Sequence, residues 1–372
     1  MRIAFTGGGT GGHLYPIIAV AREVKRIAEE ERILDLELYY FGPDAIPADS
    51  VQAEDLIVTR VTAGKIRRYF SVFSFIDAFK VAFGILEAFW KMLLVMPDVV
   101  FCKGGFGSFP VTLAARIYRI PVVVHESDSM PGLVNRWAGR WARRVAVSFA
   151  GAAKYFPPAR TALIGVPVRN RIIGGNREPA REVFGVFSNR PVVLVLGGSQ
   201  GAAVLNRALI EVLGPLVEEF EVIHSAGPKN IEDVRLETAP ILEGGGGVYY
   251  HPFGFMNEDE MRGAFALADI VVSRAGATAI YEIAANAKPA ILIPIKIAAQ
   301  DHQKANAYEY VRRGAAIVIE EDNLTPSVLL HEVKKLNTDT GRRARMAEAA
   351  RSFARPEAAG ILARELLTLG LH

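Results

Sequence analysis

Two glycine-rich loops carry the residue types best suited to holding phosphate groups. The first, residues 7–12 (GGGTGG), follows the apolar segment 3–5, and the second, residues 197–202 (GGSQGA), follows the apolar segment 192–196. Glycine lets the backbone turn tightly and approach a ligand, and the helix that follows presents free N–H groups to an anion. One such loop in each half predicts two nucleotide-type domains that face each other across a cleft.

His13 directly follows the first loop, at the start of a helical pattern. An imidazole titrates near neutral pH, so at this position it could take a proton from a sugar hydroxyl held beside the loop. The alternative is a histidine that makes only local hydrogen bonds. The neighbouring phosphate-type loop favours the base.

The sequence around the loops argues against three other chemistries. The first loop fits the G-x-G-x-x-G spacing of a dinucleotide site and the second does not, but the predicted strand 37–41 has no acid at its end to bind a ribose, so an oxidoreductase is the weaker alternative. No lysine follows either glycine run, which excludes a Walker loop. The sequence has no Asp-x-Asp, so we expect no metal-chelated diphosphate and no required cofactor.

Cysteine usage and the first residues indicate where the protein works. Cys102 is the only cysteine, which excludes an intramolecular disulfide and a cysteine-rich metal site and favours a reducing cytoplasm. Met1 leads straight into the first predicted strand, which leaves no room for a signal peptide.

Polar groups also follow other predicted strands. Residues 103–108 (KGGFGS) form either a third glycine loop or a turn with a core aromatic. Residues 125–128 (HESD) form either a cleft-facing acid pair or a solvated strand end. Glu282 lies on the helix opened by residues 273–278 (SRAGAT), where a carboxylate could stabilise the helix dipole or accept two ribose hydroxyls. A further polar cluster spans residues 300–306.

The elements that must position these residues alternate between short β-branched runs and helical patterns. A chain of 372 residues is expected to form about two domains. Alternation of this kind predicts parallel sheets with helices on both faces, that is, two doubly wound Rossmann-like α/β domains. An irregular segment near residues 165–169 marks the boundary. The predicted strands are 3–5, 37–41, 98–101, 121–125, 145–149, 191–196, 221–224, 269–273, 289–294 and 315–319.

Charge and aromatic residues are concentrated in the first half. Residues 1–165 hold 20 Lys and Arg against 15 Asp and Glu, whereas the remainder holds 23 against 25. Residues 74–95 contain four charged residues, so they cannot span a bilayer. They form either a helix buried on most sides or a helix that dips into a membrane surface. Arginines interleaved with tryptophans over residues 136–144 suit anionic headgroups, and no nucleic-acid motif accompanies them.

Taken together, these motifs resemble the MurG family of bacterial glycosyltransferases, which have the two-domain GT-B fold. The resemblance covers nearly the whole chain in the right order, from the first loop with His13 and Pro16 to Asp301-His302-Gln303 with Asn306-Ala307. The family adds N-acetylglucosamine to the lipid-linked muramyl-peptide of peptidoglycan synthesis, with inversion and without a required metal. It works at the cytoplasmic face of the membrane as a peripheral protein.

The resemblance implies a role for each site residue. His13 is the base and Glu126 joins it as a catalytic residue, while Glu282 binds the ribose of UDP-N-acetylglucosamine. It also implies a first domain of residues 1–165 joined by a C-terminal helix 355–372, and a second domain of residues 166–354. The remaining donor contacts are Thr10, Gly11, Gly12, Asp128, Arg169, Ser199, Gln200, Phe255, Met256, Ala277, Thr278 and Gln303, and the acceptor contacts are Gly104, Gly105, Phe106 and Ser108.

The sequence departs from the family at two positions and leaves alternative functions open. The family has Gln and Asn where this sequence has Ser127 and Asp128, which adds a negative charge beside two anionic substrates. A diacylglycerol glycosyltransferase or a UDP-N-acetylglucosamine 2-epimerase of similar fold are the alternative enzymes. A protein that only binds nucleotide sugars is the non-enzymatic alternative.

Overall fold

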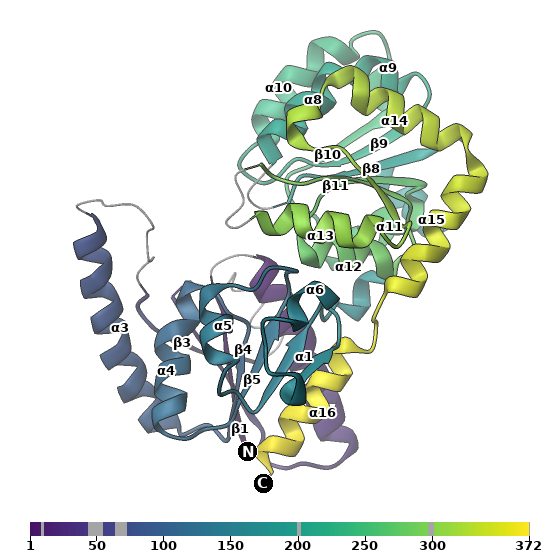
Figure 1. Cartoon of the computed structure of the whole chain (residues 1–372). Helices are drawn as coiled ribbons and strands as arrows, with labels where there is room; N and C mark the ends of the chain where they lie inside the picture. The colour runs from purple at the N-terminus through teal and green to yellow at the C-terminus, as the bar shows by residue number, and fades with distance from the viewer. Residues whose placement is uncertain (9–10, 44–54, 64–72, 199–201, 297–300, 372) are drawn as a thin grey trace. The chain divides into compact units, whose positions relative to one another are not determined.

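The computed structural model divides the chain into two compact units, each built around one parallel sheet (Figure 1). It describes residues 1–8, 11–43, 55–63, 73–198, 202–296 and 301–371. Unit 1 comprises Met1–Val168 with Arg355–His372, and unit 2 comprises Arg169–Ala354.

Unit 1 is a parallel sheet whose described strands run in the order β3-β2-β1-β4-β5-β6-β7. Its strands are β1 (Arg2–Thr6), β2 (Glu37–Gly42), β3 (Ile57–Arg60), β4 (Val99–Cys102), β5 (Val122–Glu126), β6 (Arg144–Val147) and β7 (Thr161–Leu163). Its helices are α1 (Gly11–Glu30), α3 (Phe73–Val95), α4 (Phe109–Ile117), α5 (Leu133–Ala138), α6 (Ala150–Ala153) and α16 (Ala358–Gly370), with short 3-10 turns at Phe106–Ser108 and Pro158–Arg160.

Unit 2 repeats the plan, with described strands in the order β10-β9-β8-β11-β12-β13. Its strands are β8 (Val192–Leu196), β9 (Glu221–Ser225), β10 (Tyr250–Phe253), β11 (Ile270–Arg274), β12 (Ala290–Ile293) and β13 (Ala316–Val318). Its helices are α7 (Arg177–Phe184), α8 (Ala202–Glu211), α9 (Leu213–Val217), α10 (Ile231–Leu242), α11 (Glu258–Leu267), α12 (Ala277–Ala285), α13 (His302–Val311), α14 (Pro326–Thr338) and α15 (Thr340–Phe353), with 3-10 turns at Asn170–Ile172, Gly246–Tyr249 and Glu321–Asn323.

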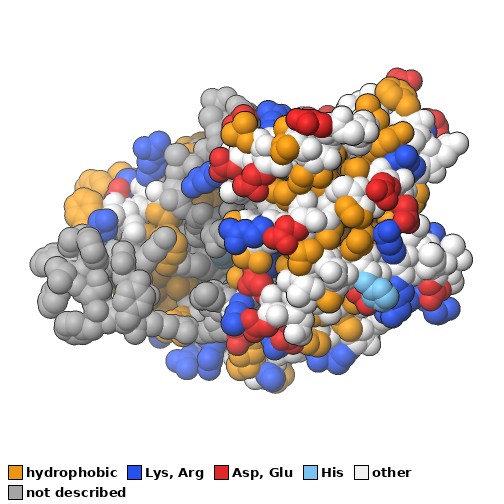
Figure 2. Space-filling view, turned by 90° about the horizontal axis from the view of Figure 1, so that it is seen from above, with side chains coloured by type: hydrophobic (Ala, Val, Ile, Leu, Met, Phe, Trp, Pro, Cys, Tyr) orange, Lys and Arg blue, Asp and Glu red, His pale blue; other side chains and the backbone are white. Residues whose placement is uncertain are grey.

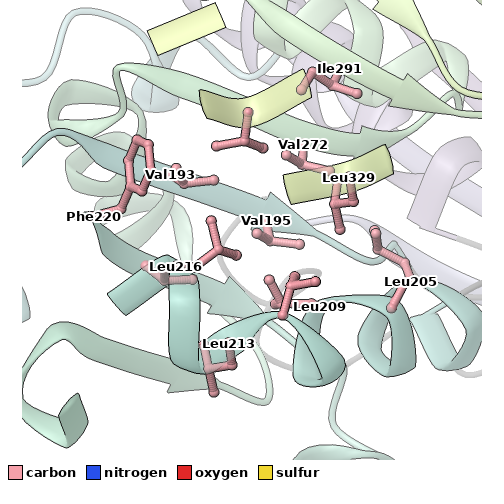
Figure 3. Close-up of a cluster of buried hydrophobic side chains, with 14 of the residues drawn as sticks. Val193, Val195, Leu205, Leu209, Leu213, Leu216, Phe220, Val272, Ile291 and Leu329 are labelled. Carbon is pink, nitrogen blue, oxygen red and sulfur yellow. The ribbon is translucent and has the colours of Figure 1, made fainter. Parts of the chain in front are cut away.

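The central strands are mostly apolar because helices cover both faces of each sheet. Every residue of β8 and β11 is buried. In unit 2, side chains from β8 such as Val193 and Val195 pack against α8, α9 and α14 (Figure 3). This burial explains why continuous β-branched runs predicted these strands correctly, and the fold class predicted from the sequence is confirmed.

The strand order fixes where a ligand can approach each unit. In unit 1 the chain reverses its winding between the neighbouring strands β1 and β4, and in unit 2 between β8 and β11. In doubly wound sheets, ligands bind outside the carboxyl ends of the strands at this switch point. Both predicted glycine loops begin here, because they follow β1 and β8.

The last helix of the chain belongs to unit 1. Figure 1 shows α16, in yellow, lying against α1. Leu362, Leu366 and Leu367 of α16 are buried in the same core as the apolar face of α1. Ion pairs from Arg364 to Glu31 (3.3 Å) and from Arg144 to Glu365 (2.8 Å) fasten its outer side.

Candidate active site

The glycines at the switch point of unit 1 allow two loops to touch through their backbones. Gly104 and Gly105, in the loop after β4, have φ angles of 84° and 85°, which favour glycine. A Cβ added at Gly105 would lie only 3.0 Å from the Cα atom of Gly8. Any larger residue would therefore separate the loop after β1 from the loop after β4.

His13 lies over this contact. It is the third residue of α1 and is half-buried. Its Nε2 atom is 3.4 Å from the position that a Cβ on Gly105 would occupy. The structure thus brings the predicted base and the predicted acceptor loop together. Gly11 and Gly12 open the same helix, which places their backbone at its N-terminal end.

Ser108 has a local role in the loop after β4. Its side chain is buried, and its hydroxyl donates a hydrogen bond of 2.8 Å to the carbonyl oxygen of Gly105. This bond closes the turn that opens α4, whereas Phe106, at the start of that turn, is half-buried. Direct contact of Ser108 with an acceptor therefore stays a prediction, and its observed function is to shape the glycine turn.

Glu126 ends β5 as a buried carboxylate. One oxygen accepts the backbone N–H of Asp128 (2.9 Å), and the other accepts the backbone N–H of Gly132 (3.1 Å) and the side-chain amide of Asn135 (2.9 Å). Burial, together with the nearby charge of Asp128, raises the pKa of Glu126 to about 7. These hydrogen bonds show that Glu126 holds the loop that follows β5. A catalytic role for Glu126 stays a prediction.

Sequence reasoning missed two residues of this network, Lys103 and Asn135. Lys103 is only 2% exposed, and its Nζ contacts the hydroxyl of Ser127. The signal for Lys103 was a cation placed between an all-apolar strand and a glycine pair. Asn135 gave no such signal because it lies inside a short helical pattern.

In unit 2 the corresponding loops also meet. Gly198, after β8, has a φ angle of 70°, and a Cβ added to it would lie 3.9 Å from the Cβ of Arg274, at the end of β11. Ala277 and Thr278 then form the first turn of α12. The N-terminus of α12 therefore lies at the switch point, where its backbone N–H groups suit an anion.

Arg169 and Glu282 form a buried ion pair beside this turn. The guanidinium Nη2 atom lies 2.8 Å from the carboxylate, and the two side chains are 6% and 8% exposed. Glu258 lies 3.9 Å from the same guanidinium. The structure therefore unites two predicted donor contacts that are far apart in the sequence. Glu282 therefore carries a charged partner within its own unit.

Three other predicted donor residues have different surroundings in the structure. Phe255 is 61% exposed, so its ring is available to a planar base, whereas Met256 is 4% exposed and packs inside the unit. The side-chain oxygen of Gln303, in the first turn of α13, accepts the N–H of Ile295 at 3.2 Å. Gln303 thus shapes the chain after β12.

Some predicted residues lie outside the described part of the chain. These are Thr10 in the first loop and Ser199 and Gln200 in the second. Among the described residues, no group of three His, Cys, Asp or Glu side chains is arranged to hold a metal ion.

Comparison with known proteins identifies the class of enzyme to which the chain belongs. The Glycosyltransferase family 28 N-terminal domain matches residues 3–147, and the Glycosyltransferase family 28 C-terminal domain matches residues 192–361. The chain is therefore a two-domain hexosyltransferase of this family.

Individual relatives narrow this class. A protein of Legionella pneumophila (strain Paris) is 37% identical over 335 residues, which cover 89% of this chain and 88% of the relative. A protein of Bacillus thuringiensis (strain Al Hakam) is 35% identical over 338 residues, which cover 90% and 91%. Both are named UDP-N-acetylglucosamine--N-acetylmuramyl-(pentapeptide) pyrophosphoryl-undecaprenol N-acetylglucosamine transferase, the second with the number 3. The crystal structure of Acinetobacter baumannii MurG superimposes with a TM-score of 0.73 at 25% identity and covers 99% of both chains. The chain belongs to the MurG family.

Proposed function

We propose that this enzyme transfers N-acetylglucosamine from UDP-N-acetylglucosamine to undecaprenyl-pyrophosphoryl-N-acetylmuramyl-pentapeptide, the step from lipid I to lipid II in peptidoglycan synthesis. The observation that carries the proposal is identity of 35–37% to relatives of that name along about nine-tenths of both chains. Residues at the switch point of each unit would supply the chemistry that such a transfer needs.

The acceptor reaction is assigned to unit 1. We assign His13 as the base that takes the proton from the muramyl 4-hydroxyl, whose oxygen then attacks the anomeric carbon and gives a β1–4 link with inversion. The position of its Nε2 atom over Gly105 supports this role. Gly104, Gly105 and Phe106 would border the acceptor, and Glu126 would hold the adjoining loop that carries Asp128.

The donor is assigned to unit 2. Glu282, oriented by Arg169, would accept the ribose hydroxyls, and the exposed ring of Phe255 would lie against uracil. The N-terminus of α12 and the glycine loop after β8 would stabilise the negative charge that develops on the departing UDP. This backbone stabilisation is our reason to propose that no metal or other cofactor is required.

A membrane surface is the proposed third partner. Among the described residues, no helix is both long and apolar enough to cross a bilayer. The described side chains of α3 nevertheless leave an apolar face open, with Phe83, Leu86, Trp90 and Leu94 61–70% exposed. Of the two alternatives for residues 74–95, a helix buried on most sides does not describe this part of α3. An open apolar face of this kind suits the interfacial depth of a bilayer.

A basic cluster adjoins α5. Arg136, Arg140 and Arg143 are exposed, and the guanidinium of Arg116 lies 5.3 Å from the ring centre of Trp141. We propose that this cluster and α3 dock on anionic lipids at the cytoplasmic face of the membrane. On the face shown in Figure 2, described basic and acidic side chains are instead interleaved, and we propose no nucleic-acid partner.

Vesicle binding tests the membrane contact. We expect Trp90→Ser with Leu94→Ser to lower co-sedimentation with vesicles containing anionic lipid, while Leu236→Ser, which removes a 75% exposed leucine from α10, leaves it unchanged. Equal binding of both variants would show that α3 does not contact the membrane surface.

A transfer assay tests the reaction. The protein is incubated with UDP-N-acetylglucosamine and a short-chain lipid-pyrophosphoryl-muramyl-pentapeptide, and the products are followed by mass. We expect UDP release only with the acceptor, and a product heavier by one N-acetylhexosamine. Transfer to diacylglycerol, or formation of UDP-N-acetylmannosamine without acceptor, would replace the proposal with one of the alternatives.

A further inference from the structure

A buried lysine lies where three loops of unit 1 meet. Lys103 directly follows β4, its backbone N–H donates to the carbonyl of Thr6 in β1 (2.8 Å), and its side chain is 2% exposed. A Cβ added to Gly7 would lie 3.3 Å from the Cβ of Lys103. The Nζ atom contacts the hydroxyl of Ser127 in the loop after β5. Lys103 thus links the loops after β1, β4 and β5.

Burying an ammonium group without a counter-charge is strongly unfavourable. Two acidic groups act against this cost, because the charges of Glu126 and Asp128 raise the pKa of Lys103 and so favour its charged form. Burial lowers the pKa of Lys103, and Cys102 and His125 are the other titratable groups that interact with it. The cluster therefore contains one cation and two acidic groups.

The proposed acceptor makes this balance important. A lipid pyrophosphate is anionic, and two unbalanced carboxylates beside its binding loop would repel it. Lys103 is too deeply buried to reach a substrate directly, so it can act only through Ser127 and through the charge of its neighbours.

We propose that Lys103 is a positioning and charge-balancing residue that allows the acidic loop Ser127–Asp128 to stand beside the anionic lipid-pyrophosphate acceptor. This inference rests on the proposed function for the identity of the acceptor. The charge balance itself is a property of the fold and can be measured without any substrate.

A double-mutant cycle tests the inference on the full chain. Lys103→Met removes the cation and keeps a linear side chain, and Asp128→Asn removes one of the carboxylates. Lys154→Met, at an exposed lysine of the same unit, is the matched control. Each protein is assayed with UDP-N-acetylglucosamine and a water-soluble, short-chain lipid-pyrophosphoryl acceptor.

We expect Lys103→Met to raise the KM for the acceptor on the order of 10-fold, a typical coupling for groups in one network, while the KM for the donor changes less than about 2-fold. In the Asp128→Asn background the same substitution is expected to change the acceptor KM by less than about 3-fold. An equal effect in both backgrounds, or an equal change in donor KM, would overturn the inference.

Thermal unfolding gives a readout that needs no activity and covers the case in which Lys103→Met folds poorly. We expect Lys103→Met to melt about 10 °C lower than the parent, and the double variant to melt above Lys103→Met. The gap between these two variants should widen from pH 6 to pH 8.5, because Glu126 ionises over that range. If the double variant melts no higher at either pH, the inference fails. Absence of acceptor turnover in the parent protein would instead refute only the proposed function.

Discussion

The buried pair of Arg169 and Glu282 allows a quantitative prediction for Glu282→Ala. The Nη2 atom of Arg169 lies 2.8 Å from a carboxylate oxygen of Glu282, and both side chains are less than a tenth exposed. Removing one partner of a buried pair leaves an unpaired charge and costs about 3–5 kcal/mol. In a unit of this size about 1 kcal/mol shifts Tm by 2–4 °C, so we expect the Tm of unit 2 to fall by roughly 10 °C.

The matched control is Glu232→Ala. Glu232 pairs with Arg235 at 3.2 Å on α10, but the side chains are 79% and 57% exposed. An exposed pair of this kind contributes at most about 1 kcal/mol, so its Tm should change by less than about 4 °C. Replacing both members of the buried pair, as Arg169→Met with Glu282→Leu, should recover most of the loss because neither member is then left as a buried charge without the other.

Differential scanning calorimetry with and without UDP separates stability from binding. Wild-type unit 2 gains about 2.7 kcal/mol when UDP is present at 100 times its Kd. If Glu282 also binds the ribose, the paired replacement should recover stability but not this gain. A Tm for Glu282→Ala within 2 °C of wild type would refute the reasoning, because it would show that the buried charge of Arg169 does not depend on Glu282 for its stabilisation.

Three further predictions concern unit 1. His13→Ala should lower kcat by about 10²–10⁴-fold with little change in the Kd for UDP, measured by calorimetry; an equal loss of UDP binding would make His13 structural. Gly105→Ala should lower Tm and raise the acceptor KM, because φ is 85° and the added Cβ would press on Gly8; an unchanged Tm would contradict this. The raised pKa of Glu126 means that the folded state binds more protons than the unfolded state between about pH 4.5 and 7, so its contribution to stability falls as pH rises through that window. Glu126→Gln should flatten this slope in denaturant unfolding; the comparison must be with wild type, because buried His125 and His224, whose pKa values are lowered, act in the opposite direction.

The strands that sequence reasoning predicted and those that it missed differ in burial. The strands β8 and β11 are central and buried along their whole length, and both were predicted. The missed strands are β3, β7 and β10, and all three lie at sheet edges. Most residues of β3 and β7 are exposed, and β10 contains Pro252. An edge strand is covered on fewer sides, so its sequence lacks the continuous apolar run that marks a central strand.

The candidate site could be predicted only where its signal is local. The glycine loops and His13 form contiguous motifs, and the structure places the described part of each at a switch point. The pairing of Arg169 with Glu282 joins residues 113 positions apart, which a single sequence cannot reveal. The catalytic role of Glu126 was implied only by the family resemblance, and its place at a strand end left two alternatives open. The three donors around its carboxylate show that it holds the following loop.

The return of α16 to the first unit has a consequence during protein synthesis. Unit 1 begins with Met1, yet its core includes Leu362, Leu366 and Leu367 from the end of the chain. The ribosome completes about 190 residues between the two parts of this core, which takes roughly 10–40 s at ordinary elongation rates. During that time the nascent first unit exposes the surface that α16 will cover, so a fragment that stops before Arg355 is expected to aggregate or to require a chaperone.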